Sequence, residues 1–146
     1  MIDAGVTPYI FTLRAGDSSV MHPSSKKLID AGLITHQKEV KRLQSLVAVF
    51  QLFLKRPKNT FFCLIKALKS KNRWLYFQAV PFALTLLDKD IDYIHAHFAD
   101  VNFLFARALS KWTGIPFGVT THRYDLLEDP IPLAIAANNF SEAEGI

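Results

Sequence analysis

Three histidines lie where two β-rich runs end, and their spacing suits two kinds of chemistry. His95 and His97 are two residues apart, so on a strand both rings point to one face. His122 ends the next β-rich run, and Asp125 follows three residues later. An imidazole can donate a hydrogen bond to developing negative charge, and three histidines with a carboxylate are also a set that zinc accepts. The residues therefore indicate either anion stabilisation or metal binding.

The stretch that carries these residues is expected to form a β-α-β unit. A buried-type strand at 93–97 is followed by helical periodicity over about 100–112, and a second strand is expected over 115–121. Gly114 stands where a left-handed residue often ends a helix. Such units have parallel strands, and their ligands collect beyond the carboxyl ends of those strands. We therefore expect the strand-end histidines at one shared rim.

A short strand and three more helices are expected in the first part of the chain. The run VTPYIFTL at 6–13 favours a strand, and apolar residues at three- and four-residue spacing predict a helix over about 38–56. Pro57 suits the first turn of a second helix, and a third is predicted over about 73–87 with a kink at Pro81. The apolar faces expected to form the core sides of the first two helices are Val40, Leu43, Leu46, Val47, Phe50, Phe53 and Leu54, and then Phe61, Leu64, Ile65 and Leu68.

Length and composition favour one compact domain, because the chain has 146 residues and half of them are hydrophobic. The single cysteine, Cys63, excludes an internal disulfide, and its apolar neighbours predict that it is buried. The N-terminus lacks the basic and apolar regions of a secretory signal, so cytoplasm is the expected compartment. No apolar run reaches the ~18 residues needed to span a bilayer.

Positive charge is concentrated in one stretch, which leaves the rest of the chain net negative. Residues 26–73 hold 12 Lys and Arg against Asp30 and Glu39. Basic residues bracket an apolar middle over 38–58, and even the side expected to face away from the core carries Ala48, Val49 and Leu52. This pattern fits docking on an anionic membrane surface, or else a helix packed under another helix or domain. Nucleic acid is not an expected partner, since no glycine-aromatic RNA motif or zinc knuckle accompanies the charge.

Three segments of the second half together resemble a known family. They are His-Ala-His-Phe at 95–98, Gly-Ile-Pro-Phe at 114–117 and Thr-Thr-His-Arg-Tyr-Asp at 120–125. In this order and spacing they resemble the N-terminal, acceptor-side domain of family-4 GT-B glycosyltransferases that act in bacterial exopolysaccharide assembly. The resemblance extends over about residues 3–128 and is clearest at 91–127.

The resemblance implies an α/β fold with a Rossmann-like parallel sheet flanked by helices. On this basis 1–130 would be a partial GT-B N-terminal domain with a basic helical region at about 26–87, and 131–146 is an unassigned tail. The family's first strand and glycine-rich loop would precede Met1, and its nucleotide-binding domain is not matched. We therefore expect this chain alone to be inactive, with exposed sheet edges that favour aggregation.

The resemblance also assigns roles to individual residues. It implies that His122 is the catalytic residue and contacts the donor sugar or its phosphate, although a strand-end histidine can also be satisfied locally. The substrate-binding residues that it implies are His97, Phe98, Thr121, Arg123 and Asp125. Arg123 replaces the family's usual Ala or Gly. Asp125 could orient His122 or the acceptor, or it could instead cap the helix that follows. No metal or cofactor is implied, because the nucleotide sugar is a substrate.

The sequence thus predicts the acceptor-side half of a retaining, metal-independent hexosyltransferase. Its partners would be a nucleotide sugar, a glycan or lipid-linked acceptor, and the inner face of the cytoplasmic membrane through residues 38–58. One alternative is a noncatalytic membrane-surface module. Another is a small zinc hydrolase that uses His95, His97, His122 and Asp125, although such enzymes are usually barrels of ~250 residues.

Overall fold

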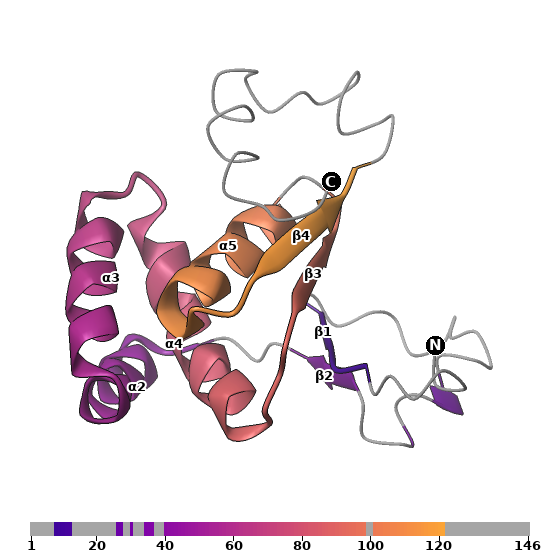
Figure 1. The fold of residues 1–146 in the computed structure, drawn as a ribbon, viewed down its shortest axis with the longest axis horizontal. Coiled ribbons are helices and arrows are strands. Elements are labelled where there is room, and N and C mark those ends of the chain that lie inside the picture. The colour runs from indigo at the N-terminus through magenta and orange to yellow at the C-terminus, as the bar shows by residue number, and fades with distance from the viewer. Residues whose placement is uncertain are drawn as a thin grey trace. The chain divides into compact units, whose positions relative to one another are not determined.

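The computed structural model describes residues 8–12, 26–27, 30, 34–36, 40–98 and 101–121. Its contacts divide the chain into two units, Met1–Val40 and Lys41–Ile146, and each is described by itself. In the first unit, β1 (Ile10–Thr12) pairs in parallel with β2 (Ile34–His36), with Ile10 opposite Ile34 (Figure 1). The strand predicted at 6–13 is therefore confirmed over Ile10–Thr12, whereas β2 was not predicted.

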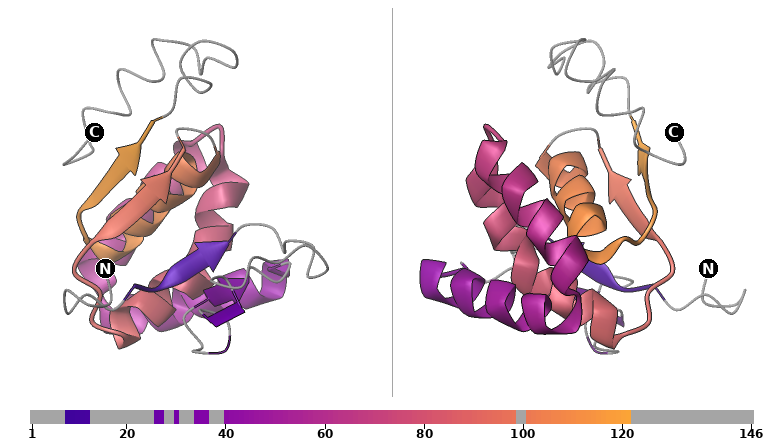
Figure 2. Two further views of the ribbon diagram at one scale, coloured as in Figure 1. Left: turned by 90° about the vertical axis from the view of Figure 1, so that its right-hand side faces the viewer. Right: turned by 60° about the vertical axis from the view of Figure 1, so that its left-hand side comes forward.

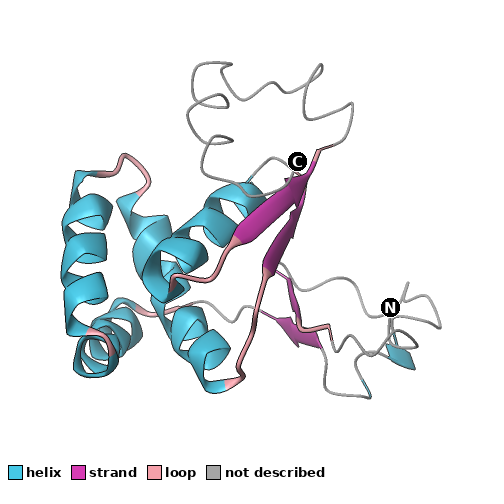
Figure 3. Cartoon of the chain, in the orientation of Figure 1, coloured by secondary structure: helices cyan, strands magenta, loops and turns pink. Residues whose placement is uncertain are grey.

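The second unit contains the helices and the β-α-β motif that the sequence indicates. Its elements in chain order are α2 (Arg42–Lys55), α3 (Pro57–Lys69), α4 (Arg73–Asp88), β3 (Ile94–His97), α5 (Val101–Thr113) and β4 (Phe117–Thr120). The described residues thus form a mixed α/β structure in which helices predominate (Figure 3). Their strands form two separate two-stranded parallel sheets, which is less than the broad sheet of a Rossmann-like domain.

The β3–β4 sheet is covered by α5 on one face (Figure 2). The polar side chains of the two strands lie on the other face. Ile94 and Ala96 are buried, while His95 and His97 between and after them are exposed. The expectation of a fully buried strand at 93–97 is therefore wrong. Residues alternate between the two faces of a strand, and in the described part only the face toward α5 receives a helix.

The core lies between α5, the sheet and α4. Trp112 of α5 is fully buried, and its indole nitrogen donates a hydrogen bond to the Tyr76 carbonyl oxygen at 2.9 Å. The helices α4 and α5 can approach closely because Ala79 and Ala83 of α4 are small and buried. The rings that fill the remaining space include two edge-to-face or tilted pairs, Phe82 with Phe105 and Phe103 with Phe117.

The helices α2 and α3 face the core with the opposite sides to those expected. Apart from Val40, which is half-buried, the predicted core residues of α2 are between 43% and 72% exposed. The buried residues are instead Ser45, Ala48 and Leu52 on α2, and Thr60, Cys63 and Ala67 on α3. The predicted α3 face is exposed at Phe61, Ile65 and Leu68 and half-buried at Leu64. Both helices thus pack through their smaller side chains and turn large apolar residues outward.

The start of α3 is joined to the end of α5 by side-chain hydrogen bonds. Arg56 donates to the Thr113 carbonyl oxygen, and Asn59 donates to that of Trp112 at 2.8 Å. The Cys63 thiol donates to the carbonyl oxygen of Lys111. The last carbonyl groups of a helix have no partner within the helix, so these bonds satisfy groups that would otherwise be unpaired.

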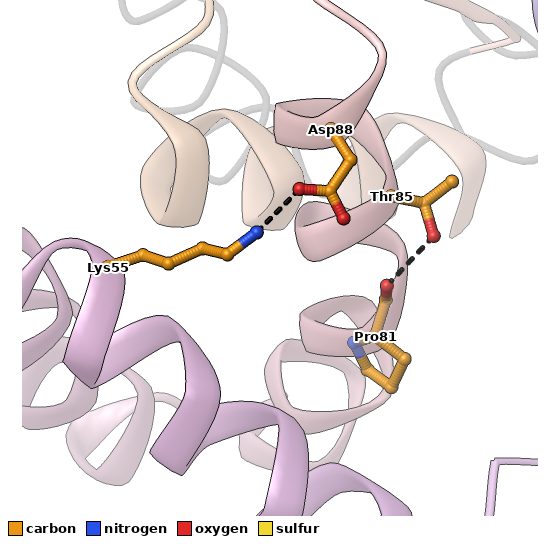
Figure 4. Close-up of polar contacts among 4 residues, drawn as sticks. All are labelled: Lys55, Pro81, Thr85 and Asp88. Atoms are coloured by element: carbon orange, nitrogen blue, oxygen red, sulfur yellow. Dashed lines mark hydrogen bonds and ion pairs between the residues drawn. The ribbon is translucent and has the colours of Figure 1, made fainter.

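The helix α4 continues through Pro81 as one element, and its C-terminal half makes one polar contact within the helix and one with α2. Thr85 Oγ1 donates a hydrogen bond to the Pro81 carbonyl oxygen at 3.2 Å, and Lys55 of α2 forms an ion pair with Asp88 (Figure 4). Both charged side chains are about half exposed or more, so this pair contributes little to stability. Within the described ranges, no helix has both the length and the apolar character needed to cross a membrane.

Candidate functional site

The carboxyl ends of β3 and β4 meet at one edge, as the sequence predicts. The two strands are parallel and in a register that places His97 opposite Thr120. The Phe98 backbone N–H donates to the Thr120 carbonyl oxygen at 3.0 Å, which extends the pairing to the last residue before the loop. Thr121 follows directly and is half-buried. Of the predicted site residues, the structure thus brings His97, Phe98 and Thr121 to this rim.

Phe98 adopts an uncommon backbone conformation at the rim. Its φ of 80° lies in the left-handed region, which non-glycine residues seldom occupy. Its ring packs edge-on against the His97 imidazole with centroids 4.4 Å apart, and 39% of the residue stays exposed. The Asn102 side-chain amide, from the first turn of α5, donates to the His97 carbonyl oxygen at 3.4 Å. The rim therefore presents an imidazole beside an exposed aromatic ring.

His95 and Thr120 form a contact that the sequence reasoning missed. The Thr120 hydroxyl lies 3.0 Å from His95 Nε2, and both residues are exposed on the sheet face away from α5. Either atom can be the donor, because that depends on the imidazole tautomer. The signal that could have shown this pair is the i, i+2 spacing of the histidines combined with parallel pairing to a strand that ends in two threonines. Thr120 thereby joins the polar face that leads to the rim.

The remaining predicted site residues, His122, Arg123 and Asp125, lie outside the described residues. The zinc alternative needs two of them, His122 and Asp125, together with His95 and His97. Among the described residues there is no group of three His, Cys, Asp or Glu side chains that could hold a metal ion. The rim described above can offer hydrogen bonds and an aromatic surface to a polar ligand.

Comparison with known proteins gives no relative for this chain: no family model, no curated protein and no solved structure matches it.

Proposed function

We propose that this chain is the acceptor-side part of a retaining, metal-independent glycosyltransferase that transfers a hexose from a nucleotide sugar to a polysaccharide or lipid-linked acceptor. The observation that carries the proposal is the parallel, in-register pairing of β3 with β4, which ends with His97 opposite Thr120. His122 follows two residues later in the chain. A strand pair of this kind is where α/β proteins commonly collect ligands.

The chemistry of the transfer suits the groups at this rim. The leaving group is a nucleoside diphosphate, so negative charge grows as the bond to the anomeric carbon breaks. An imidazole N–H at His122 would stabilise that charge, which is the role proposed for it. Phe98 offers an exposed ring against which the apolar face of a sugar can pack, and His97 beside it offers a polar edge. Thr121, Arg123 and Asp125 complete the proposed set.

We further propose that β3 and β4 are two strands of a Rossmann-like sheet of the GT-B N-terminal type. The donor nucleotide would be held mainly by a second domain. On this view the chain alone binds acceptor glycans but transfers no sugar.

Imidazole resonances followed by NMR during ligand titration test this proposal. Oligosaccharide acceptors should shift the His97 and His122 signals with one shared midpoint, because both rings would contact one ligand. His97→Ala should weaken binding about tenfold, the loss expected for one hydrogen bond to a polar ligand. Gln51→Ala, a change at an exposed polar position of α2, is the control and should leave the midpoint unchanged. Nucleotide sugars should bind no tighter than roughly millimolar.

Two results would overturn the glycosyltransferase proposal. One is a set of glycan titrations in which His97 responds and His122 does not, since the two rings would then not share a ligand. The other is stoichiometric zinc in the purified chain, retained after dialysis and lost on His95→Ala, which would support the hydrolase alternative instead.

A second function, docking on an anionic membrane surface, is favoured by the outward face of α2. This face, defined as Leu43, Leu46, Val47, Phe50, Phe53 and Leu54, is apolar and exposed, and Lys41, Arg42, Lys55 and Arg56 stand at its two ends. Each basic residue near an anionic leaflet contributes roughly 1 kcal/mol, and the apolar residues add to this on insertion.

Vesicle flotation tests the docking proposal. The chain should float with vesicles that contain phosphatidylglycerol, and much less with pure phosphatidylcholine or at high salt. Phe50→Ser with Leu54→Ser should abolish flotation. Phe61→Ser with Leu68→Ser, which replaces the same two residue types at exposed positions on α3, should reduce it less. Equal flotation with neutral vesicles would contradict an electrostatic docking surface.

A further inference from the structure

The first turns of α2 and α4 border a cavity apart from the histidine rim, and it shares Leu46 and Arg42 with the docking surface of α2. Its volume is about 540 Å³. The lining residues are Arg42, Ser45 and Leu46 from α2 and Arg73, Trp74 and Phe77 from α4. Each residue lies within the first five of its helix, so both helix N-termini border this one cavity.

Positive charge gathers at the cavity, and none of the described carboxylates pairs with it. Arg42 and Arg73 are the first residues of their helices, where the helix dipole is itself positive. Neither helix has an acidic residue in its first turn, and neither guanidinium forms an ion pair with a described carboxylate. Arg42 lies over the Trp74 ring, 5.8 Å from its centroid. Cations at positive helix ends repel one another, and a bound anion would relieve this repulsion.

Ser45 gives an independent sign that a ligand belongs in the cavity. It is only 1% exposed, and its hydroxyl has no hydrogen-bond partner among the residues that the structure describes. A buried hydroxyl without a partner is destabilising, and such groups are uncommon in folded proteins. Since Ser45 lines the cavity, a ligand oxygen there could accept a hydrogen bond from its hydroxyl.

The other walls of the cavity are apolar and partly open to solvent. Trp74 is 41% exposed, Leu46 is more exposed still, and Phe77 is half-buried. Leu46 also belongs to the outward face of α2, so the cavity opens onto that apolar surface. The combination of two guanidinium groups, a hydroxyl and an indole suits an oxyanion attached to an apolar group better than it suits a bare ion.

We propose that this cavity binds the phosphate group of a phosphate ester that carries an apolar substituent. Arg42 and Arg73 donate to the phosphate oxygens, the Ser45 hydroxyl donates to one of them, and the apolar substituent packs on Trp74 toward Leu46. The same chemistry is found in a phospholipid headgroup at a membrane and in a soluble phosphate ester. The cavity shares no residue with the histidine rim, so a test of the cavity does not test the glycosyltransferase proposal.

Tryptophan fluorescence offers a direct test, because the chain has two tryptophans and the other one, Trp112, is fully buried. The probes are inorganic phosphate, glycerol phosphate and dihexanoyl phosphatidate below its micelle concentration. We expect a saturable change with phosphatidate, about tenfold weaker binding of glycerol phosphate, and no signal in Trp74→Phe. Arg42→Gln with Arg73→Gln should weaken phosphatidate binding about tenfold or more. Ser45→Ala should weaken it a few-fold.

The matched control is Lys58→Gln with Lys69→Gln, which removes the same charge from exposed positions on α3. It should change phosphatidate binding less than about twofold. An equal loss in this control, or no saturable binding of any probe, would overturn the site. Equal affinity for all three probes would overturn the apolar part of the proposal. A tighter response to phosphatidate in vesicles than to the soluble form assigns the site to lipid, and the reverse assigns it to a soluble ester.

Circular dichroism and thermal melting show whether each variant is folded. Arg42 and Arg73 are exposed, so their replacement should leave the helix signal unchanged. If the double variant nevertheless loses structure, Trp74→Ala replaces it, and unchanged binding of soluble dihexanoyl phosphatidate by that variant in isothermal titration calorimetry would overturn the proposal.

Discussion

The left-handed backbone conformation of Gly114 ends α5 and turns the chain toward β4. Its φ of 77° lies in the left-handed region, as expected for the residue that follows a helix, and its N–H donates to the Ser110 carbonyl oxygen at 2.7 Å. A side chain at this position would meet Arg56 Nη1 at 3.8 Å, which is ordinary contact. Any penalty for substitution therefore comes from the backbone.

Gly114→Ala should lower the free energy of unfolding by about 1–2 kcal/mol, because a residue with a Cβ is disfavoured in this conformation. Gly114→Asn should cost less, since asparagine tolerates the left-handed region. Urea denaturation of both variants measures the difference. An alanine variant as stable as the parent would show that the turn has another accessible conformation.

Cys63 links stability to alkaline pH. Burial raises the pKa of its thiol above 9.0, and nearby Lys66 and Lys111 offset part of this rise. As pH rises past 9.0, the unfolded chain loses its thiol proton before the folded chain does, so the free energy of unfolding falls until the folded pKa is passed. Below that window the thiol contributes no pH dependence.

The expected outcome is that Cys63→Ala loses less stability between pH 8 and pH 10.5 than the parent. Urea denaturation at both pH values gives the comparison, and lysine and tyrosine titration cancel because both proteins share those groups. If the free energy of unfolding falls equally with pH in the two proteins, the thiol ionises alike in the folded and unfolded chains.

At the scale of elements, the apolar periodicity of α2 predicts the helix correctly but not which side of that helix is buried. The helix has two apolar sides, one made of large residues and a narrower one that combines Ser45 and Ala48 with Leu52. The large side was expected to form the core, but Leu52 is fully buried while Leu43 is 72% exposed. Small residues allow the helix axes to approach, and the gain from close packing with α4 depends on a partner that periodicity does not reveal.

A pair of leucine substitutions on this one helix tests which side is buried. Leu52→Ala should destabilise the chain by about 2–5 kcal/mol, since it leaves a cavity in packed surroundings. Leu43→Ala should change stability by less than about 0.5 kcal/mol. Thermal or urea unfolding distinguishes them, and a larger loss at Leu43 would show that the large apolar side is the one buried in solution.

The β-α-β motif, by contrast, could be predicted from the sequence. Its strands, the helix between them and the glycine stop follow from local patterns, so residues such as Gly114 locate the boundaries. The exposed face of β3 could not be foreseen, because burial depends on whether a helix covers it. The contact between His95 and Thr120 and the meeting of Arg42 with Trp74 also join residues far apart in sequence. Such contacts depend on how elements pack together.

For the whole molecule, the outward face of α2 raises the question of solubility. A contiguous apolar patch on a protein surface usually marks a contact with a partner, a membrane or a second copy of the chain. In the absence of lipid, this face should favour association of chains with one another. The proposed docking on membranes and a tendency to aggregate in plain buffer thus have the same physical origin.

Phe50→Glu with Leu54→Glu should reduce self-association without lowering the melting temperature, because both residues are more than 60% exposed. Sedimentation velocity over a range of concentrations measures the association, and Lys58→Gln with Lys69→Gln on α3 is a control for the same change of two units in net charge. A parent chain that stays monomeric at high concentration would contradict the expectation, as would a double variant that unfolds.

The hydrogen bonds from Arg56, Asn59 and Cys63 to the end of α5 have a consequence for how the molecule opens. Fraying normally begins at a helix terminus. Here the last turn of α5 can unwind only if its hydrogen bonds to these side chains break. Amide hydrogens in the first turns of α3 and in the last turn of α5 should therefore exchange with deuterium in a single concerted event. Asn59→Ala would separate that event into two, with α3 exchanging first.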